Sequence, residues 1–65
     1  MGSDYGRELE RLLVEAGCTF VRNGKGDHEI WHSPITNRHF VLDRSCEVRH
    51  TANGTLKDAG LPKAF

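Results

Sequence analysis

The sequence has few of the features that mark membrane, secreted or zinc-binding proteins. It contains no run of 18 apolar residues, and its start lacks the basic residues and apolar stretch of a secretory signal. Cysteine occurs only at Cys18 and Cys46, and neither has a second cysteine close by, as zinc knuckles require. We therefore expect a cytoplasmic protein without membrane contact or cofactor. Both thiols should be reduced, with Cys18 buried and Cys46 in a loop.

An excess of charge of one sign is also missing, because nine Lys and Arg are balanced by nine Asp and Glu. Nucleic-acid-binding domains are usually clearly basic, so composition alone gives no support for such a partner. A chain of 65 residues can form only one small domain. We expect that domain to span residues 1–65, and we assign no function to residues 1–3, which should be disordered or left over from expression.

The first periodic pattern is that of an amphipathic helix over residues 4–16. Apolar residues recur there at steps of three and four, with charged residues between them. Ser3 or Asp4 can cap the start of this helix. Gly17 can take the left-handed conformation that commonly ends a helix.

Three short stretches rich in β-branched and aromatic residues follow, separated by turn-forming residues: 19–22, 28–32 and 38–42. They predict an antiparallel meander. Apolar residues fall on both alternating sets, so an uncovered face carrying Trp31 or Val41 is a candidate for a partner or dimer contact. We expect Trp31 to pack in the core or against a neighbouring strand rather than to stack on a base.

A second, shorter helix is predicted over residues 51–59. Gly54 weakens it by about 1 kcal/mol relative to alanine, and Gly60 can end it as Gly17 ends the first. The order is helix, three strands, helix. This order indicates an α+β domain, in which two helices pack on one face of a three-stranded antiparallel sheet.

Two segments and this order of elements resemble the HicA toxins of bacterial toxin–antitoxin pairs, over nearly the whole chain. The segments are Gly24-Lys25-Gly26-Asp27-His28-Glu29-Ile30-Trp31 and Leu56-Lys57-Asp58-Ala59-Gly60-Leu61-Pro62-Lys63. The resemblance implies a fold similar to the double-stranded-RNA-binding domain, an mRNA endoribonuclease activity and a HicB antitoxin as partner. It also implies that the histidine of the Gly26-Asp27-His28 motif is needed for RNA cleavage.

The residues around His28 suit that chemistry. Imidazole titrates near neutral pH and can take a proton from a ribose 2′-hydroxyl without a metal. Backbone N–H groups from Gly24 to Gly26 could approach a phosphate, which Lys25 could neutralise. Arg22, across the same hairpin, is a second candidate phosphate contact. The proton donor for the leaving 5′-oxygen stays open among His32, His39 and Lys25.

Two alternatives use the same residues. The chain could be a non-catalytic RNA- or protein-binding module, as its zero net charge suggests. It could also be a zinc hydrolase, because residues 28–32 spell H-E-x-x-H. That motif needs a helix, however, and on a strand its two histidines lie about 13 Å apart and cannot share an ion. Gly26 before the motif and Pro34 after it favour a strand. We also leave open a homodimer or a hetero-oligomer with the antitoxin.

Overall fold

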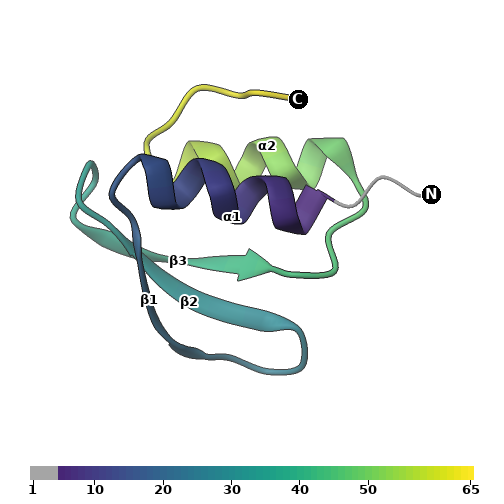
Figure 1. Cartoon of the computed structure of the whole chain (residues 1–65), viewed down its shortest axis with the longest axis horizontal. Coiled ribbons are helices and arrows are strands. Elements are labelled where there is room, and N and C mark those ends of the chain that lie inside the picture. Colours follow the sequence, from purple (N-terminus) through teal and green to yellow (C-terminus); the bar gives the residue numbers. More distant parts are fainter. Residues whose placement is uncertain (1–4) are drawn as a thin grey trace.

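The helix–strand–strand–strand–helix order expected from the sequence is present in the computed structural model, which describes residues 5–65. The expected cap at Ser3 or Asp4 and the expectation for residues 1–3 lie outside the described residues. Both helices lie on the same side of the sheet (Figure 1). The elements are α1 (Tyr5–Glu15), β1 (Thr19–Asn23), β2 (His28–Ser33), β3 (Arg38–Asp43) and α2 (Arg49–Asp58).

A glycine with positive φ follows the end of each helix, as predicted. Gly17 has a φ of 92°, and the N–H of Cys18 donates to the carbonyl of Leu13 at 2.9 Å. The same pattern recurs after α2, where Gly60 has a φ of 84°. These hydrogen bonds satisfy carbonyl groups that the last helical turn leaves without a partner.

The sheet is antiparallel with the strand order β1-β2-β3. A bulge in β1 places Val21 between two paired positions, and every residue of β1 is exposed. In β2 and β3 the register is regular, and His28, the first residue of β2, lies opposite Asp43, the last residue of β3. The register therefore brings together two residues that lie 15 positions apart in the sequence.

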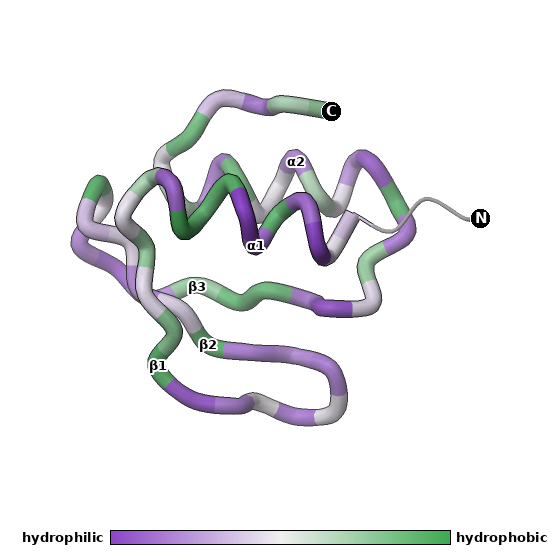
Figure 2. The backbone as a smooth tube through the Cα atoms, viewed as in Figure 1, coloured by the Kyte–Doolittle hydropathy of each residue, from purple (hydrophilic) through white to green (hydrophobic). Residues whose placement is uncertain are grey.

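The core lies between the helices and the inner face of β2 and β3. Trp31 is buried there, with 4% of its surface exposed, so its predicted core packing is confirmed. Val41 is 46% exposed on the opposite, outer face, so Val41 and not Trp31 marks the uncovered side. The tip of the β1–β2 hairpin is mostly hydrophilic (Figure 2). The buried apolar residues are Leu9, Leu13, Cys18, Trp31, Phe40, Leu42, Cys46, Ala52, Leu56 and Ala59.

Both cysteines are free thiols, as expected. Cys46 belongs to the connection between β3 and α2 and is nevertheless buried, with its thiol donating to the carbonyl of Val48 at 3.4 Å. Within residues 5–65, neither helix has the length and apolar character needed to cross a membrane.

Candidate active site

His28 lies where the β1–β2 hairpin turn meets β2. Its side chain is 51% exposed. Its N–H donates to the carbonyl of Lys25 at 3.1 Å, and its carbonyl accepts from the N–H of Gly24 at 2.8 Å. A Cβ atom at Gly24 would lie 3.2 Å from that carbonyl oxygen, so a larger residue would crowd the turn. These contacts fix the backbone of His28 and leave its ring open to solvent.

The nearest charged group to the imidazole is a carboxylate that the sequence analysis missed. The Nε2 atom of His28 lies 3.8 Å from Oδ2 of Asp43. This distance is too long for a hydrogen bond, but it allows an ion pair when the imidazole is protonated. Sequence reasoning ended the third strand at Leu42, one residue short of Asp43. Extending the predicted third strand by one residue would have paired Asp43 with His28 in the antiparallel register.

The other oxygen of Asp43 is held by its own chain. Oδ1 accepts from the hydroxyl of Ser45 at 2.8 Å and from the Ser45 N–H at 3.0 Å. These two hydrogen bonds, with a smaller contribution from the charge of His28, lower the pKa of Asp43 below its ordinary value against the opposing effect of partial burial. Asp43 is therefore ionised at neutral pH.

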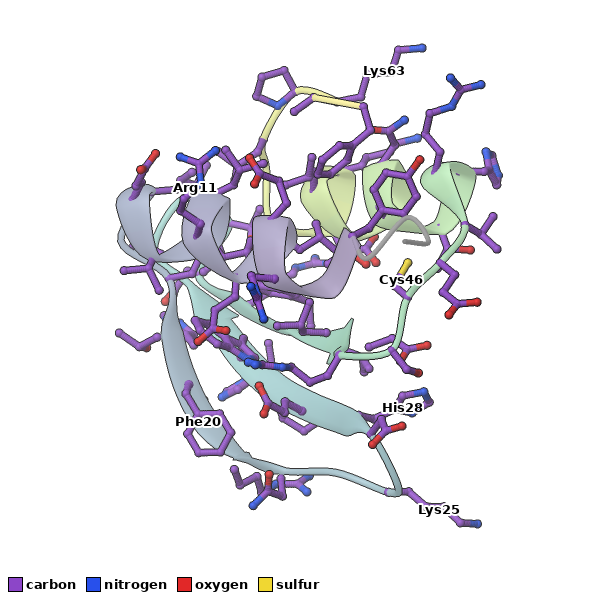
Figure 3. The ribbon with its side chains drawn as sticks, turned by 45° about the vertical axis from the view of Figure 1, so that its right-hand side comes forward. Arg11, Phe20, Lys25, His28, Cys46 and Lys63 are labelled. Atoms are coloured by element: carbon purple, nitrogen blue, oxygen red, sulfur yellow. The ribbon has the colours of Figure 1, made fainter. Side chains whose placement is uncertain are left out.

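The predicted phosphate-binding turn is only partly available. Gly26 has a φ of 64° and open space around its Cα, as a flexible turn requires. The N–H of Gly24 is already bonded to the carbonyl of His28, so it is not free to donate to a phosphate in this structure. Lys25 belongs to the same turn, and its side chain extends into solvent away from His28 (Figure 3). The turn therefore offers Lys25 and Gly26, not the whole 24–26 segment.

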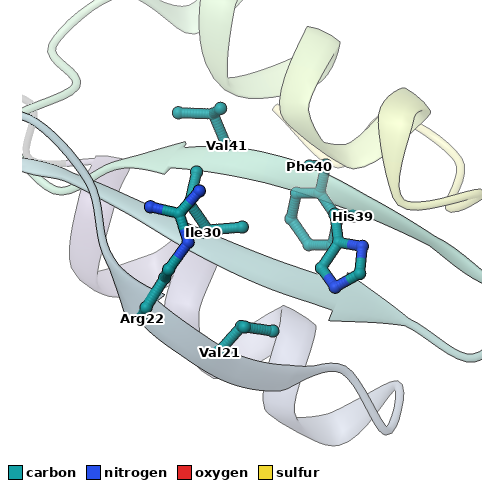
Figure 4. Close-up of a pocket in the computed structure, with 6 residues that line it drawn as sticks. All are labelled: Val21, Arg22, Ile30, His39, Phe40 and Val41. Carbon is teal, nitrogen blue, oxygen red and sulfur yellow. The ribbon is translucent and has the colours of Figure 1, made fainter.

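Arg22 shares the outer face of the sheet with His28. It pairs with Ile30 of β2. Ile30 lies two residues after His28 on the same strand, and side chains two residues apart on a strand point to the same face. Figure 4 shows its guanidinium lying over Ile30, toward Val41. Arg22, Ile30 and Val41 line one shallow hollow, together with Val21, His39 and Phe40. Arg22 is thus close to His28 along the face but is not directed at its ring.

Two of the candidate proton donors lie at the far end of the sheet. His32 pairs with His39, their ring centroids are 5.3 Å apart, and Nε2 of His32 lies 3.2 Å from Oδ1 of Asn37. His32 lies four residues after His28 along β2, a distance of about 13 Å. His32 and His39 therefore lie too far from His28 to share one phosphate group with it. Only Lys25 remains at the same end of the hairpin.

The H-E-x-x-H segment is part of β2, so the predicted strand is confirmed. Glu29 points to the inner face, where it accepts a hydrogen bond from Nε1 of Trp31 at 3.0 Å, while His28 and His32 point outward. Within the part of the chain that the structure describes, no three His, Cys, Asp or Glu side chains cluster as metal ligands. The geometry that a zinc protease needs from this motif is not formed.

Comparison with known proteins places this domain among the toxins of bacterial toxin–antitoxin pairs. Residues 6–61 match the family model described as "HicA toxin of bacterial toxin-antitoxin". Because the match covers most of the 65 residues, the chain belongs to the HicA toxin family. This family implies an antitoxin partner. Searches of curated proteins and of solved structures each found no match.

Proposed function

We propose that this protein is an mRNA endoribonuclease toxin in which His28 is the general base. His28 takes the proton of a ribose 2′-hydroxyl, the 2′-oxygen attacks the adjacent phosphorus, and the bond to the 5′-oxygen of the next nucleotide breaks. The observation that carries the proposal is the half-exposed imidazole of His28, which lies 3.8 Å from the ionised carboxylate of Asp43. This pairing of an accessible base with a fixed anion suits proton abstraction near neutral pH.

Asp43 acts in this proposal as a positioning residue. Its carboxylate stabilises the imidazolium that forms when His28 accepts the proton, in the way that a carboxylate supports histidine in other hydrolases. Ser45 holds the carboxylate in place through two hydrogen bonds. Distances between catalytic groups are commonly long in the absence of substrate and shorten when substrate binds. The distance of 3.8 Å between His28 and Asp43 is therefore compatible with this role.

The surrounding cations would bind the RNA backbone. Lys25, in the same turn as His28, is the remaining candidate to neutralise the phosphate or to protonate the leaving 5′-oxygen. Arg22 on the same face is a second phosphate contact. The chemistry proposed uses side chains alone and needs no metal or cofactor. A substrate of mRNA places the activity in the cytoplasm.

The antitoxin would neutralise this activity by covering the outer face beside His28. Three apolar side chains stand on that face, and Val21 and Val41 are 43% and 46% exposed while Ile30 is partly buried. Exposed apolar patches of this kind are typical of protein contacts. A HicB-like antitoxin is the partner that we propose for this face, in preference to a second copy of the chain.

The test is expression of three variants in bacteria, with purified proteins assayed on RNA in EDTA. We expect the wild type to arrest growth and to cleave RNA, and His28→Ala to remain folded but inactive, a loss of at least about 100-fold. Asp43→Asn should lower kcat about fivefold with little change in KM, because an exposed ion pair is worth up to about 1 kcal/mol.

The matched control is His39→Ala, which removes an exposed histidine from the neighbouring strand and should leave cleavage unchanged. A toxic His28→Ala variant would reject the catalytic role of His28. A wild type that binds a HicB-like protein tightly but cleaves no RNA would instead identify a non-catalytic module of the same fold. Activity that EDTA abolishes and Zn²⁺ restores would support a metal-dependent hydrolase.

A further inference from the structure

A second group of cations lies on α2 and the chain that follows it. From Arg49 to the end of the sequence there are three cations, Arg49, Lys57 and Lys63, and one acid, Asp58, which gives a net charge of +2. His50 adds a further titratable group on the same helix. The neutral total charge of the chain therefore conceals an uneven distribution.

Ion pairs elsewhere in the chain make this uneven distribution of charge more pronounced. Arg11 on α1 is bonded to Glu8 and to Glu15, and Arg44 contacts Glu10 at 2.7 Å and Glu29 at 3.6 Å. These acids thus neutralise cations on or beside α1. The three cations of α2 and the tail are exposed and form no ion pair with any of residues 5–65.

The tail is fixed against α2 by specific contacts. The side chain of Asn53 accepts from the N–H of Phe65 at 3.1 Å and donates to its carbonyl at 3.4 Å. The ring of Phe65 packs edge-on against Tyr5 of α1, with centroids 5.0 Å apart. Lys63 lies two residues before this anchor, so it is held near the cations of α2.

A groove lies between the tail and the helix. It consists of two adjoining hollows of about 470 and 570 Å³ that share His50, Asn53 and Lys63. Lys57 lines the first hollow and Arg49 the second. We call it the α2–tail groove. Its walls therefore carry all three unpaired cations of this part of the chain.

The start of α2, where Arg49 lines the α2–tail groove, lies at the same end of the molecule as His28. Asp43, opposite His28, ends β3, and the connection over residues 44–48 leads directly to Arg49. In Figure 3, Lys25, His28, Cys46 and Lys63 follow one another from the bottom of the view to its top, with the helices between the sheet and the tail. A strand of RNA that passes His28 could therefore continue toward the groove.

We propose that the α2–tail groove binds the phosphate backbone of the RNA and anchors the strand that His28 cleaves. This inference rests on the endoribonuclease function proposed above. Long, exposed Lys and Arg side chains on a polar surface are typical of phosphate contacts. A protein partner would bind more favourably to the apolar outer face of Val21, Ile30 and Val41, because protein interfaces depend on buried apolar anchors.

The test measures RNA binding rather than cleavage. The His28→Ala chain, which leaves RNA intact, is compared with the same chain carrying Lys57→Gln and Lys63→Gln. The probe is a labelled single-stranded RNA of about 12 nucleotides, titrated at several salt concentrations. Each phosphate contact in a single strand contributes about 0.7 to the slope of log K against log salt. We expect the slope to fall by about 1.4 and the affinity at physiological salt to fall about tenfold.

Two further variants sharpen the test. Arg7→Gln with Arg38→Gln removes two exposed cations that lie outside the groove, and it should leave the slope nearly unchanged. Asn53→Ala releases the tail without removing a charge, and it should lower the slope by about 0.7 because Lys63 is no longer held in place. An unchanged slope in Asn53→Ala would contradict the assignment of Lys63 to the groove.

Equal losses in the groove variant and in the Arg7/Arg38 control would overturn the proposal, as would an unchanged slope in the groove variant. Loss of antitoxin binding with an unchanged RNA slope would assign the groove to a protein partner and would also overturn it. The two proposals can fail separately. Cleavage that depends on His28 with no effect of the groove variant rejects only the groove, whereas a groove effect without any cleavage rejects only the endoribonuclease.

Discussion

The two oxygens of the Asp43 carboxylate have different surroundings. Oδ1 accepts both hydrogen bonds from Ser45, whereas Oδ2 faces the imidazole of His28. A carboxylate fixed on one side in this way keeps its other oxygen in a constant position without further contacts. This matters for His28, because its own ring is half exposed and is held only through its backbone.

Ser45→Ala tests how this carboxylate is held. We expect the pKa of Asp43 to rise in the variant, because the hydroxyl of Ser45 is the largest cause of its lowered value. The measurement is an NMR titration of the Asp43 carboxyl carbon. A lowered pKa in the folded state stabilises the fold above the unfolded pKa of about 3.9. The stability lost in Ser45→Ala should therefore be seen above about pH 4 and should shrink as the pH falls through the folded pKa of Asp43.

The control is Ser33, a hydroxyl remote from the site that donates to the carbonyl of Ala59 at 2.7 Å. Ser33→Ala should destabilise the fold without moving the titration of Asp43. A titration of Asp43 that is the same in the wild type and in Ser45→Ala would show that Ser45 does not control the carboxylate.

At the scale of the elements, the glycines after and within α2 have opposite roles. Gly60 has a positive φ of 84°, and a Cβ atom there would lie 2.7 Å from Cγ2 of Ile35. Gly54 lies within the helix, and a Cβ atom there would meet nothing within 4 Å. Gly60 is therefore required by the backbone and its neighbours, whereas Gly54 only weakens the helix.

Gly54→Ala should stabilise the protein by about 1 kcal/mol, because alanine is the better helix former by that amount. For a domain of this size the melting temperature should rise by about 5 °C. Gly60→Ala, the matched change at the end of the same helix, should destabilise the fold by at least about 1–2 kcal/mol. Thermal unfolding followed by circular dichroism measures both. A Gly54→Ala variant that melts below the wild type would contradict the open surroundings of this position.

The elements could be predicted because their signals are local. The spacing of apolar residues and the glycines at positions 17 and 60 lie within or beside each helix, so all five elements were predicted to within two residues of their observed bounds. The start of α2 was predicted two residues late, at residue 51 rather than Arg49, for a physical reason. Its N-cap residue is Val48, which makes no side-chain cap hydrogen bond, so no sequence signal marks that helix start.

The site was less predictable because it depends on contacts between distant segments. His28 was proposed from its motif, but its pairing with Asp43 follows from the register of β2 and β3. The N–H of Gly24 was expected to be available, and only the closed hairpin shows that the carbonyl of His28 uses it. The α2–tail groove likewise depends on contacts of Asn53 with Phe65, 12 residues away.

At the scale of the whole molecule, one layer of core separates the helices from the sheet. Neighbouring residues of β3 point to opposite faces of the sheet. Leu42 is fully buried, whereas Val41 is 46% exposed on the outer face. A chain of 65 residues has a total stability of roughly 3–10 kcal/mol. Loss of a single core side chain can therefore remove a large part of that stability.

Leu42→Ala should lower the free energy of unfolding by about 2–5 kcal/mol, and Val41→Ala by no more than about 0.5 kcal/mol. Urea unfolding of both variants measures the difference. Leu42→Ala should also lose toxicity through unfolding, unlike His28→Ala, which stays folded. If Val41→Ala proves as costly as Leu42→Ala, and its cost grows with protein concentration, then the outer face is buried between two copies of the chain. The toxin would then have to dissociate before an antitoxin could cover the face beside His28.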